Sequence, residues 1–349
     1  MGIRRRWGQV DRQRIALEQL AASFEVYNKA VGKSPQTVDW YNRRLALFGR
    51  FVGDGCSLTD VTPTRVREFI VHLQEQTERH QNNPYVRPKE GKLSSAYIQG
   101  CVRALRAFAS WLHAEGYTET NRLQAVKPPK VQSKVIQVLT DEEIRRLLAR
   151  FDRDDPFGAR NFTIVWTLLD CGLRASELCG LTTEDAHLEQ GYLKVLGKGN
   201  KERLVPIGLG AQGALLRWRS YFRPQFLVSD APHLFLDATG AGLTVSALEQ
   251  VVKRAGIAAG IRRLTCHLLR HTFATNYLVR QVGDPLRLQQ ILGHTSLEMV
   301  RRYVSMANVQ RSLIETRNSP MDLILAPQRG VRNARRLQPK RPRKLRLLK

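Results

Sequence analysis

Four short segments in the second half of the chain hold polar residues whose types suit chemistry on a phosphate group. Arg174 and Arg270 each carry a fork of N–H donors that can hold phosphate oxygens. His267 precedes Arg270 by three residues, so both lie on one face of a helix, and an imidazole can transfer a proton near neutral pH. Tyr303 offers an oxygen nucleophile. This set suits a site that binds a phosphate group.

Three further residues extend this set. Glu177 follows Arg174 by three residues and can hold its guanidinium, and Lys198 lies in the turn Gly-Lys-Gly-Asn, where it can reach into a site. His294 directly precedes a helix that carries Tyr303. Each segment alone is more typical of a structural feature: a surface Arg–Glu pair, a solvated basic turn, a helix with a polar outer face, or a half-buried helix tyrosine.

The combination is far more specific than its parts. The chain contains G-L-R-x-S-E-L, G-K-G-N-K-E-R, H-x-L-R-H-T-F-A-T and L-G-H in this order, with a tyrosine nine residues after the histidine of L-G-H. This resembles the active-site signature of the tyrosine recombinase (phage integrase) family, nearest to its Xer-like branch and to transposon integrases. The resemblance is strong over residues 139–306, architectural only over 15–116, and absent over 327–349.

The resemblance implies a role for each residue. Tyr303 would attack the scissile phosphate and form a 3′-phosphotyrosyl bond, Arg174 and Arg270 would hold the nonbridging oxygens, and Lys198 would protonate the leaving 5′-oxygen. His267 would accept the tyrosine proton, His294 would bind the phosphate, and Glu177 would support the site. The covalent intermediate keeps the bond energy, so we expect no ATP, no cofactor and no metal. The expected DNA contacts are Lys201, Arg203, Arg103 and Arg106.

The charge points to a polyanionic partner. With 56 Lys and Arg against 31 Asp and Glu, the formal net charge is +25, which favours nucleic acid over a neutral metabolite. Residues 327–349 carry ten basic residues and no acid, so they form a basic tail that either contacts DNA or serves solubility. The five cysteines contain no C-x-x-C pair, which predicts neither a zinc site nor a disulfide framework.

The elements that must position these residues fall into two predicted domains. After a basic segment, 1–14, residues 15–116 read as a helical core-binding DNA-binding domain, in which Ser34-Pro35 and Thr62-Pro63 each begin a helix. Ile98, Val102, Leu105, Ala109 and Leu112 form one apolar face of a fourth helix over 94–114. The stretch 80–93 reads as a loop, and 117–138, which contains prolines and lysines, as a linker.

Residues 139–326 form the predicted catalytic domain, which precedes the tail, 327–349, expected to be flexible. Thr140 to Glu143 is a capping box, and 191–207 reads as a β-hairpin between helices. The predicted fold is mainly α with a small β-hairpin or sheet: a helical core-binding domain followed by an α+β catalytic domain of the tyrosine recombinase type. Neither a signal peptide nor a transmembrane helix is expected.

The family resemblance implies site-specific recombination of double-stranded DNA at paired sites by a homo-tetramer, through a Holliday junction, in the cytoplasm and near the nucleoid. A second recombinase subunit or a directionality factor stays open as a partner; a membrane is not expected. Two alternatives remain: a type IB topoisomerase, and a noncatalytic DNA-binding protein with a decayed site. The long 80–93 segment and the tail favour an integrase of a mobile element over a resolvase of chromosome dimers.

Overall fold

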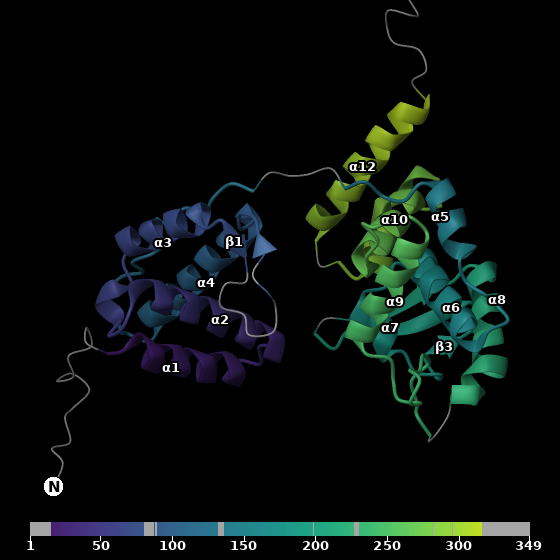
Figure 1. Cartoon of the computed structure of the whole chain (residues 1–349), viewed down its shortest axis with the longest axis horizontal. Helices are drawn as coiled ribbons and strands as arrows, with labels where there is room; N and C mark the ends of the chain where they lie inside the picture. Colours follow the sequence, from purple (N-terminus) through teal and green to yellow (C-terminus); the bar gives the residue numbers. More distant parts are fainter. Residues whose placement is uncertain are drawn as a thin grey trace, which may run out of the picture. The chain divides into compact units, whose positions relative to one another are not determined.

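The computed structural model describes residues 15–79, 87, 89–131, 136–197, 199–226, 230–280, 282–294 and 296–315, with side chains as far as Asn308. The basic segment 1–14 and the tail 327–349 lie outside these residues. The chain divides into two compact units, Met1–Lys134 and Val135–Lys349 (Figure 1). The described residues are mostly helical with one three-stranded sheet, which confirms the predicted fold class.

Within its described residues, the first unit contains four α-helices (Figure 1). Their bounds are α1 (Leu17–Ala30), α2 (Pro35–Val52), α3 (Pro63–Glu75) and α4 (Ser95–Ala114), with a short 3₁₀ turn, η3 (Leu58–Asp60), before α3. Ser34 and Thr62 cap α2 and α3 through their side-chain oxygens, and a proline follows each cap, as the sequence predicts. Local sequence therefore determines where these helices begin.

Aromatic side chains fill the core of the first unit. Phe48, Phe69 and Phe108 are completely buried, and the predicted apolar face of α4 is buried along its whole length. Leu123 and Val126, from the segment after α4, belong to the same core. Both residues lie within the predicted linker, 117–138, so part of that segment is packed into the first unit.

A small β-ladder interrupts the segment between α3 and α4. Strand β1 (Glu78–Arg79) pairs antiparallel with β2 (Lys89–Glu90). The prediction of a loop over 80–93 is wrong for Lys89 and Glu90, while 80–86 and 88 lie outside the described residues. Strands of two charged residues have no apolar alternation by which sequence could reveal them.

The second unit carries the remaining elements. They are α5 (Asp141–Leu148), α6 (Pro156–Cys171), α7 (Ala175–Gly180), β3 (Ala186–His187), β4 (Tyr192–Leu196), β5 (Glu202–Pro206), α8 (Leu209–Arg217), the π-helical η4 (Trp218–Phe222), the 3₁₀ turn η5 (Arg223–Phe226), α9 (Val245–Ala258), α10 (Cys266–Val279), α11 (Pro285–Leu292) and α12 (Leu297–Glu315). Helix α6 packs against both α8 and α10, so it lies at the centre of the unit.

The sheet of the second unit has the strand order β3-β4-β5 and is antiparallel throughout. Strands β4 and β5 are the predicted hairpin, whereas the two-residue strand β3 was not predicted. Leu193, Val195 and Val205 point into the core, while Leu196 and Leu204 are exposed. Alternation along the strands thus attaches the hairpin to the core by one face only.

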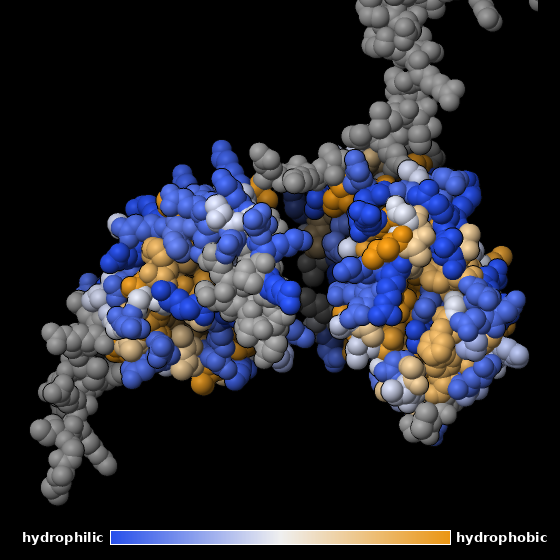
Figure 2. Space-filling view, in the orientation of Figure 1, coloured by the Kyte–Doolittle hydropathy of each residue, from blue (hydrophilic) through white to orange (hydrophobic). Residues whose placement is uncertain are grey.

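Helix α5 begins as predicted: Thr140 and Glu143 form a reciprocal capping box. The visible face of each unit is mainly hydrophilic, with smaller apolar areas between the polar residues (Figure 2). No described helix combines the length and the apolar character needed to cross a bilayer.

Candidate active site

Arg174 stands at a tight corner between two helices. Gly172 ends α6 in the left-handed conformation (φ 61°), and the ring of Phe273 lies 2.2 Å from where a Cβ would be, so no larger residue fits. Two residues later, Arg174 is the N-cap of α7. Its side chain is 34% exposed. The corner therefore presents a cation that a ligand can reach.

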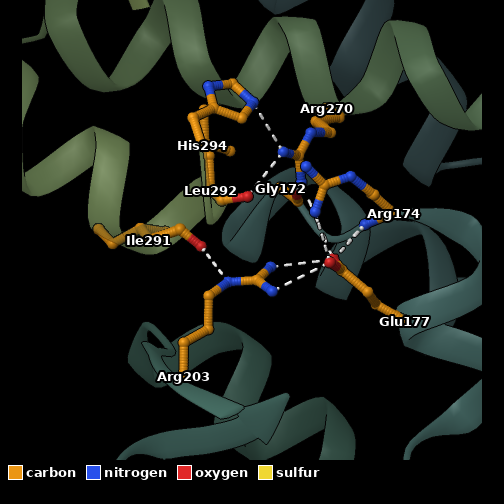
Figure 3. A network of polar contacts seen from close by, with 8 residues as sticks. All are labelled: Gly172, Arg174, Glu177, Arg203, Arg270, Ile291, Leu292 and His294. Atoms are coloured by element: carbon orange, nitrogen blue, oxygen red, sulfur yellow. Dashed lines mark hydrogen bonds and ion pairs between the residues drawn. The ribbon is translucent and has the colours of Figure 1, made fainter. Parts of the chain in front are cut away.

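Glu177 is the centre of a network of arginines (Figure 3). Its carboxylate, only 3% exposed, accepts hydrogen bonds from Arg174 Nη1 at 2.6 Å and from the Arg174 backbone N–H at 2.8 Å. Arg203 adds two bonds of 2.9 Å, one to each oxygen. Burial alone raises the pKa of Glu177, but the hydrogen bonds from Arg203 and Arg174 outweigh it and lower the pKa to about 2. Glu177 is therefore ionised at neutral pH.

Arg270 is held from three sides although it is only 2% exposed. Its Nη1 donates to the Gly172 carbonyl at 2.7 Å, and its Nη2 donates to the Leu292 carbonyl at 2.8 Å. Burial, and secondly the charge of Arg174, lower the pKa of Arg270 to about 10, so it stays cationic at neutral pH. The guanidinium is thus fixed before any ligand arrives.

His294 follows Gly293, which ends α11 in the left-handed conformation (φ 62°). Its Nε2 lies 3.0 Å from Arg270 Nη2. Because arginine can only donate, Nε2 must accept, and the proton of the neutral ring is on Nδ1. Burial, followed by the charge of Arg270, lowers the pKa of His294 to about 4. Nδ1 is buried and has no hydrogen-bond partner among the described residues.

Tyr303, on α12, is 4% exposed and lies among histidine rings. Its ring is stacked with His294 at a centroid distance of 6.1 Å and lies 5.5 Å from His271. His271 in turn contacts His267 at 4.2 Å. Burial raises the pKa of Tyr303, although the charges of Arg270, Arg302 and Arg174 oppose the rise. The hydroxyl is therefore protonated at neutral pH and needs a proton acceptor to become a nucleophile.

His267 is exposed at the start of α10, while Arg270 on the same helix is buried. Burial of part of its ring, then the charges of Arg270 and Arg302, lower the pKa of His267 below its ordinary value of 6.5. The imidazole is therefore neutral at neutral pH and can accept a proton.

Lys198 lies outside the described residues. Its neighbours form the hairpin turn, with Gly199 (φ 79°) and Asn200 (φ 58°) both left-handed. Lys201 is exposed on the same hairpin. In the first unit, on α4, Arg103 is exposed and Arg106 is partly exposed.

The expected DNA contact of Arg203 does not fit its geometry. All three of its nitrogens donate to protein groups: Nη1 and Nη2 to Glu177, and Nε to the Ile291 carbonyl at 2.7 Å. Its side chain is 12% exposed. Arg203 thus belongs to the interior network. Sequence could not show this, because its partners are 26 and 88 residues away along the chain.

His271 is the residue near the reacting groups that sequence reasoning did not single out. It is 8% exposed and contacts both His267 and Tyr303. Burial, and secondly His267, lower its pKa to about 4, so it is neutral. Its spacing of four residues from His267 is a signal that could have placed both on one helix face.

The arrangement suits stabilisation of a phosphorane. Two guanidiniums and one imidazole gather beside a tyrosine, and such groups can stabilise the negative charge of this transition state. Of the seven residues expected to form the site, the structure gathers Arg174, Glu177, Arg270, His294 and Tyr303, with His267 joined through His271.

Comparisons with known proteins agree with this chemistry. The family model described as "Phage integrase family" matches residues 137–309. The tyrosine recombinase XerD of Halalkalibacterium halodurans is 30% identical over 78% of this chain and 87% of its own length. XerD of Neisseria meningitidis serogroup B is 34% identical over 63% of this chain and 79% of its own length.

Solved structures share the fold. The XerH site-specific recombinase bound to a palindromic difH substrate has 23% identity and a TM-score of 0.64, over 86% of this chain and 84% of the other. The Tn1549 transposon integrase in complex with transposon right end DNA has 20% identity and a TM-score of 0.65, over 86% and 98%. A lambda integrase tetramer bound to a Holliday junction has 18% identity and a TM-score of 0.63, over 83% and 77%. By its sequence relatives and its fold, the chain belongs to the phage integrase family of tyrosine recombinases.

Proposed function

We propose that this chain is a site-specific DNA recombinase that cleaves and rejoins DNA through a phosphotyrosyl intermediate on Tyr303. The observation that carries the proposal is the position of this tyrosine against His294, whose Nε2 accepts from Arg270. A tyrosine beside fixed cations and an imidazole has both a nucleophile and the groups that stabilise negative charge on phosphate. Family membership supports the same chemistry.

Each residue meets one chemical need of the reaction. The Tyr303 oxygen attacks the scissile phosphorus, the bond to the 5′-oxygen breaks, and a 3′-phosphotyrosyl bond replaces it. His267 takes the tyrosine proton, and Lys198 supplies a proton to the 5′-oxygen, so that a 5′-hydroxyl leaves. The 5′-hydroxyl of the partner strand then reverses the step, and two rounds through a Holliday junction exchange both strands.

The charged donors stabilise the transition state. Arg174 and Arg270 hold the nonbridging oxygens, and His294, which contacts Arg270, binds the phosphate beside them. Glu177 supports Arg174 through the bonds to its backbone and side chain. The cations are set before DNA binds, so little rearrangement opposes the reaction.

DNA would be held mainly through its phosphates. The formal charge of +25 predicts binding that weakens steeply with salt, with Lys201 on the hairpin and Arg103 and Arg106 on α4 among the contacts. We propose a homo-tetramer on two paired sites, acting in the cytoplasm at the nucleoid, with a second recombinase subunit or a directionality factor as the further partners to test. The comparisons do not favour a topoisomerase or a decayed binding protein.

A suicide substrate tests the proposal. A nick near the cleavage site lets the short fragment that carries the free 5′-hydroxyl diffuse away, which traps the covalent adduct. The unaltered chain should form the adduct, while Tyr303→Phe should form none and yet bind DNA as well, because only the nucleophilic oxygen is removed. A Tyr303→Phe chain that still forms the adduct would disprove the assignment of the nucleophile.

Sequencing the trapped DNA would decide the biological role. The segments 80–93 and 327–349 favour the integrase of a mobile element, for which the trapped sites would be the ends of that element. Trapped sites at the region where the chromosome terminates replication would instead identify a resolvase of chromosome dimers.

A further inference from the structure

Arg203 ties together parts of the second unit that are far apart in sequence (Figure 3). It leaves from β5, grips both carboxylate oxygens of Glu177 at 2.9 Å, and donates from Nε to the carbonyl of Ile291 at the end of α11. A guanidinium has its donors in one rigid plane, so these bonds fix the relative positions of β5, α7 and α11.

Two glycines give the Arg203 side chain its place. A Cβ on Gly293, the residue before His294, would lie 3.2 Å from Arg203 Cδ and 3.3 Å from its Cζ. A Cβ on Gly197, across the hairpin, would lie 3.2 Å from Arg203 Nη1. Both backbones therefore rest on the arginine, and the turn that carries His294 is supported by it.

Arg203 also sets the charge of the site. Arg174, Arg203 and Arg270 face the single carboxylate of Glu177, with Arg270 Nη1 at 3.9 Å from it. Without Arg203, a carboxylate that is 3% exposed would keep only Arg174 and Arg270 as counterions. It would then compete with the phosphate for these two guanidiniums, and the site would hold one positive charge fewer.

We propose that Arg203 is a positioning residue for strand cleavage: it neutralises Glu177 so that Arg174 and Arg270 keep charge for the phosphate, and it supports the turn before His294. The proposal rests on the proposed function and adds a residue that touches neither DNA nor the nucleophile. It differs from the sequence-based prediction, in which Arg203 contacts DNA directly.

The two roles predict different measurements. A DNA contact contributes to affinity and to the salt dependence of binding, which should fall by about one counterion when the contact is lost. A positioning residue contributes to the rate of cleavage on bound DNA, because a shift of about 1 Å in a catalytic group can cost roughly 10²-fold. Lys201, exposed on the same hairpin, is the matched control.

The experiment compares Arg203→Ala, Arg203→Lys and Lys201→Ala with the unaltered chain on the nicked suicide substrate. Affinity is measured across a salt series, and the cleavage rate is measured with all DNA bound. Thermal unfolding identifies any variant that fails to fold. Arg203→Lys retains a cation beside Glu177, so it gives a folded comparison if the alanine variant does not fold.

For both Arg203 variants we expect affinity within about two-fold of the unaltered chain, an unchanged salt slope, and cleavage slower by on the order of 10²-fold. Lysine should not restore the rate, because it cannot make the fork to Glu177 and the bond to Ile291 together. Added methylguanidinium should speed Arg203→Ala by filling the vacated space and leave Lys201→Ala unchanged. Lys201→Ala should instead weaken binding and flatten the salt slope.

Cleavage at the full rate by Arg203→Ala or Arg203→Lys, or a loss confined to affinity and salt slope, would overturn the positioning role. Failure of the proposed function is distinguishable, because it would appear as an unaltered chain that forms no adduct at all.

Discussion

Replacing Glu177 by glutamine should destabilise the second unit strongly. The carboxylate is 3% exposed and accepts from four donors at 2.6–2.9 Å. Glutamine keeps one acceptor oxygen and turns an NH₂ group toward the arginines, so donors face donors. Loss of one partner from a buried charged network typically costs about 3–5 kcal/mol.

The pKa of Glu177 provides a second, independent value for what its ionised carboxylate contributes to the free energy of unfolding. The difference between the ordinary value of 4.5 and about 2 in the folded protein corresponds to about 3 kcal/mol of stability at neutral pH. Because the folded-state pKa is lowered, this contribution is complete above about pH 4.5 and is lost as the pH falls toward 2. Glutamine resembles a carboxyl group that is always neutral. The difference in the free energy of unfolding between the unaltered chain and Glu177→Gln should therefore be roughly half as large at pH 3 as at pH 7.

Equilibrium urea unfolding of the full chain at pH 7 and pH 3 measures both quantities. The transition of the first unit, which is unchanged, provides an internal reference. Glu298→Gln is the matched control, since its carboxylate pairs with Arg301 but is 78% exposed, and it should change the free energy of unfolding by less than about 1 kcal/mol. A Glu177→Gln loss below about 1 kcal/mol at pH 7, or an equal loss at both pH values, would refute the reasoning.

Two further predictions concern the protons of the reaction. Lys198→Ala should be slow on an ordinary substrate but recover on a bridging 5′-phosphorothiolate, whose leaving group needs no proton; a failure to recover would remove the general-acid role. Burial and the charge of Arg270 lower the pKa of His267. On acidification, the cleavage rate at limiting DNA concentration should therefore fall only below pH 6.5, where His267 becomes protonated. A cleavage rate that already falls above pH 6.5 would contradict the role of His267 as the proton acceptor.

Sequence predicted well wherever the cause is local. Ser34, Thr62 and Thr140 each cap a helix through a backbone N–H three residues ahead, and the periodic apolar face of α4 is buried as predicted. The hairpin of β4 and β5 was predicted for the same reason, since alternation and a glycine-rich turn are properties of adjacent residues.

The interior of the site was harder, because its contacts join residues distant along the chain. Arg203 reads as one more basic residue of a basic turn, yet its partners come from α7 and the end of α11. The protonated nitrogen of His294 depends on Arg270, 24 residues earlier. The burial of Leu123 and Val126 within the first unit is likewise a tertiary effect that overrides the signal of a linker.

The packing of Gly197 and Gly293 on Arg203 has a consequence for how this site can change over generations. One arginine and two glycines from two separate motifs occupy a single volume. A side chain gained at either glycine and a shorter side chain at position 203 could therefore compensate each other. Position 293 is further restricted by its φ of 62°, which leaves position 197 the freer of the two. Among related chains, positions 197 and 203 are therefore expected to covary. A chain without an arginine at position 203 is expected to tolerate a residue other than glycine at position 197.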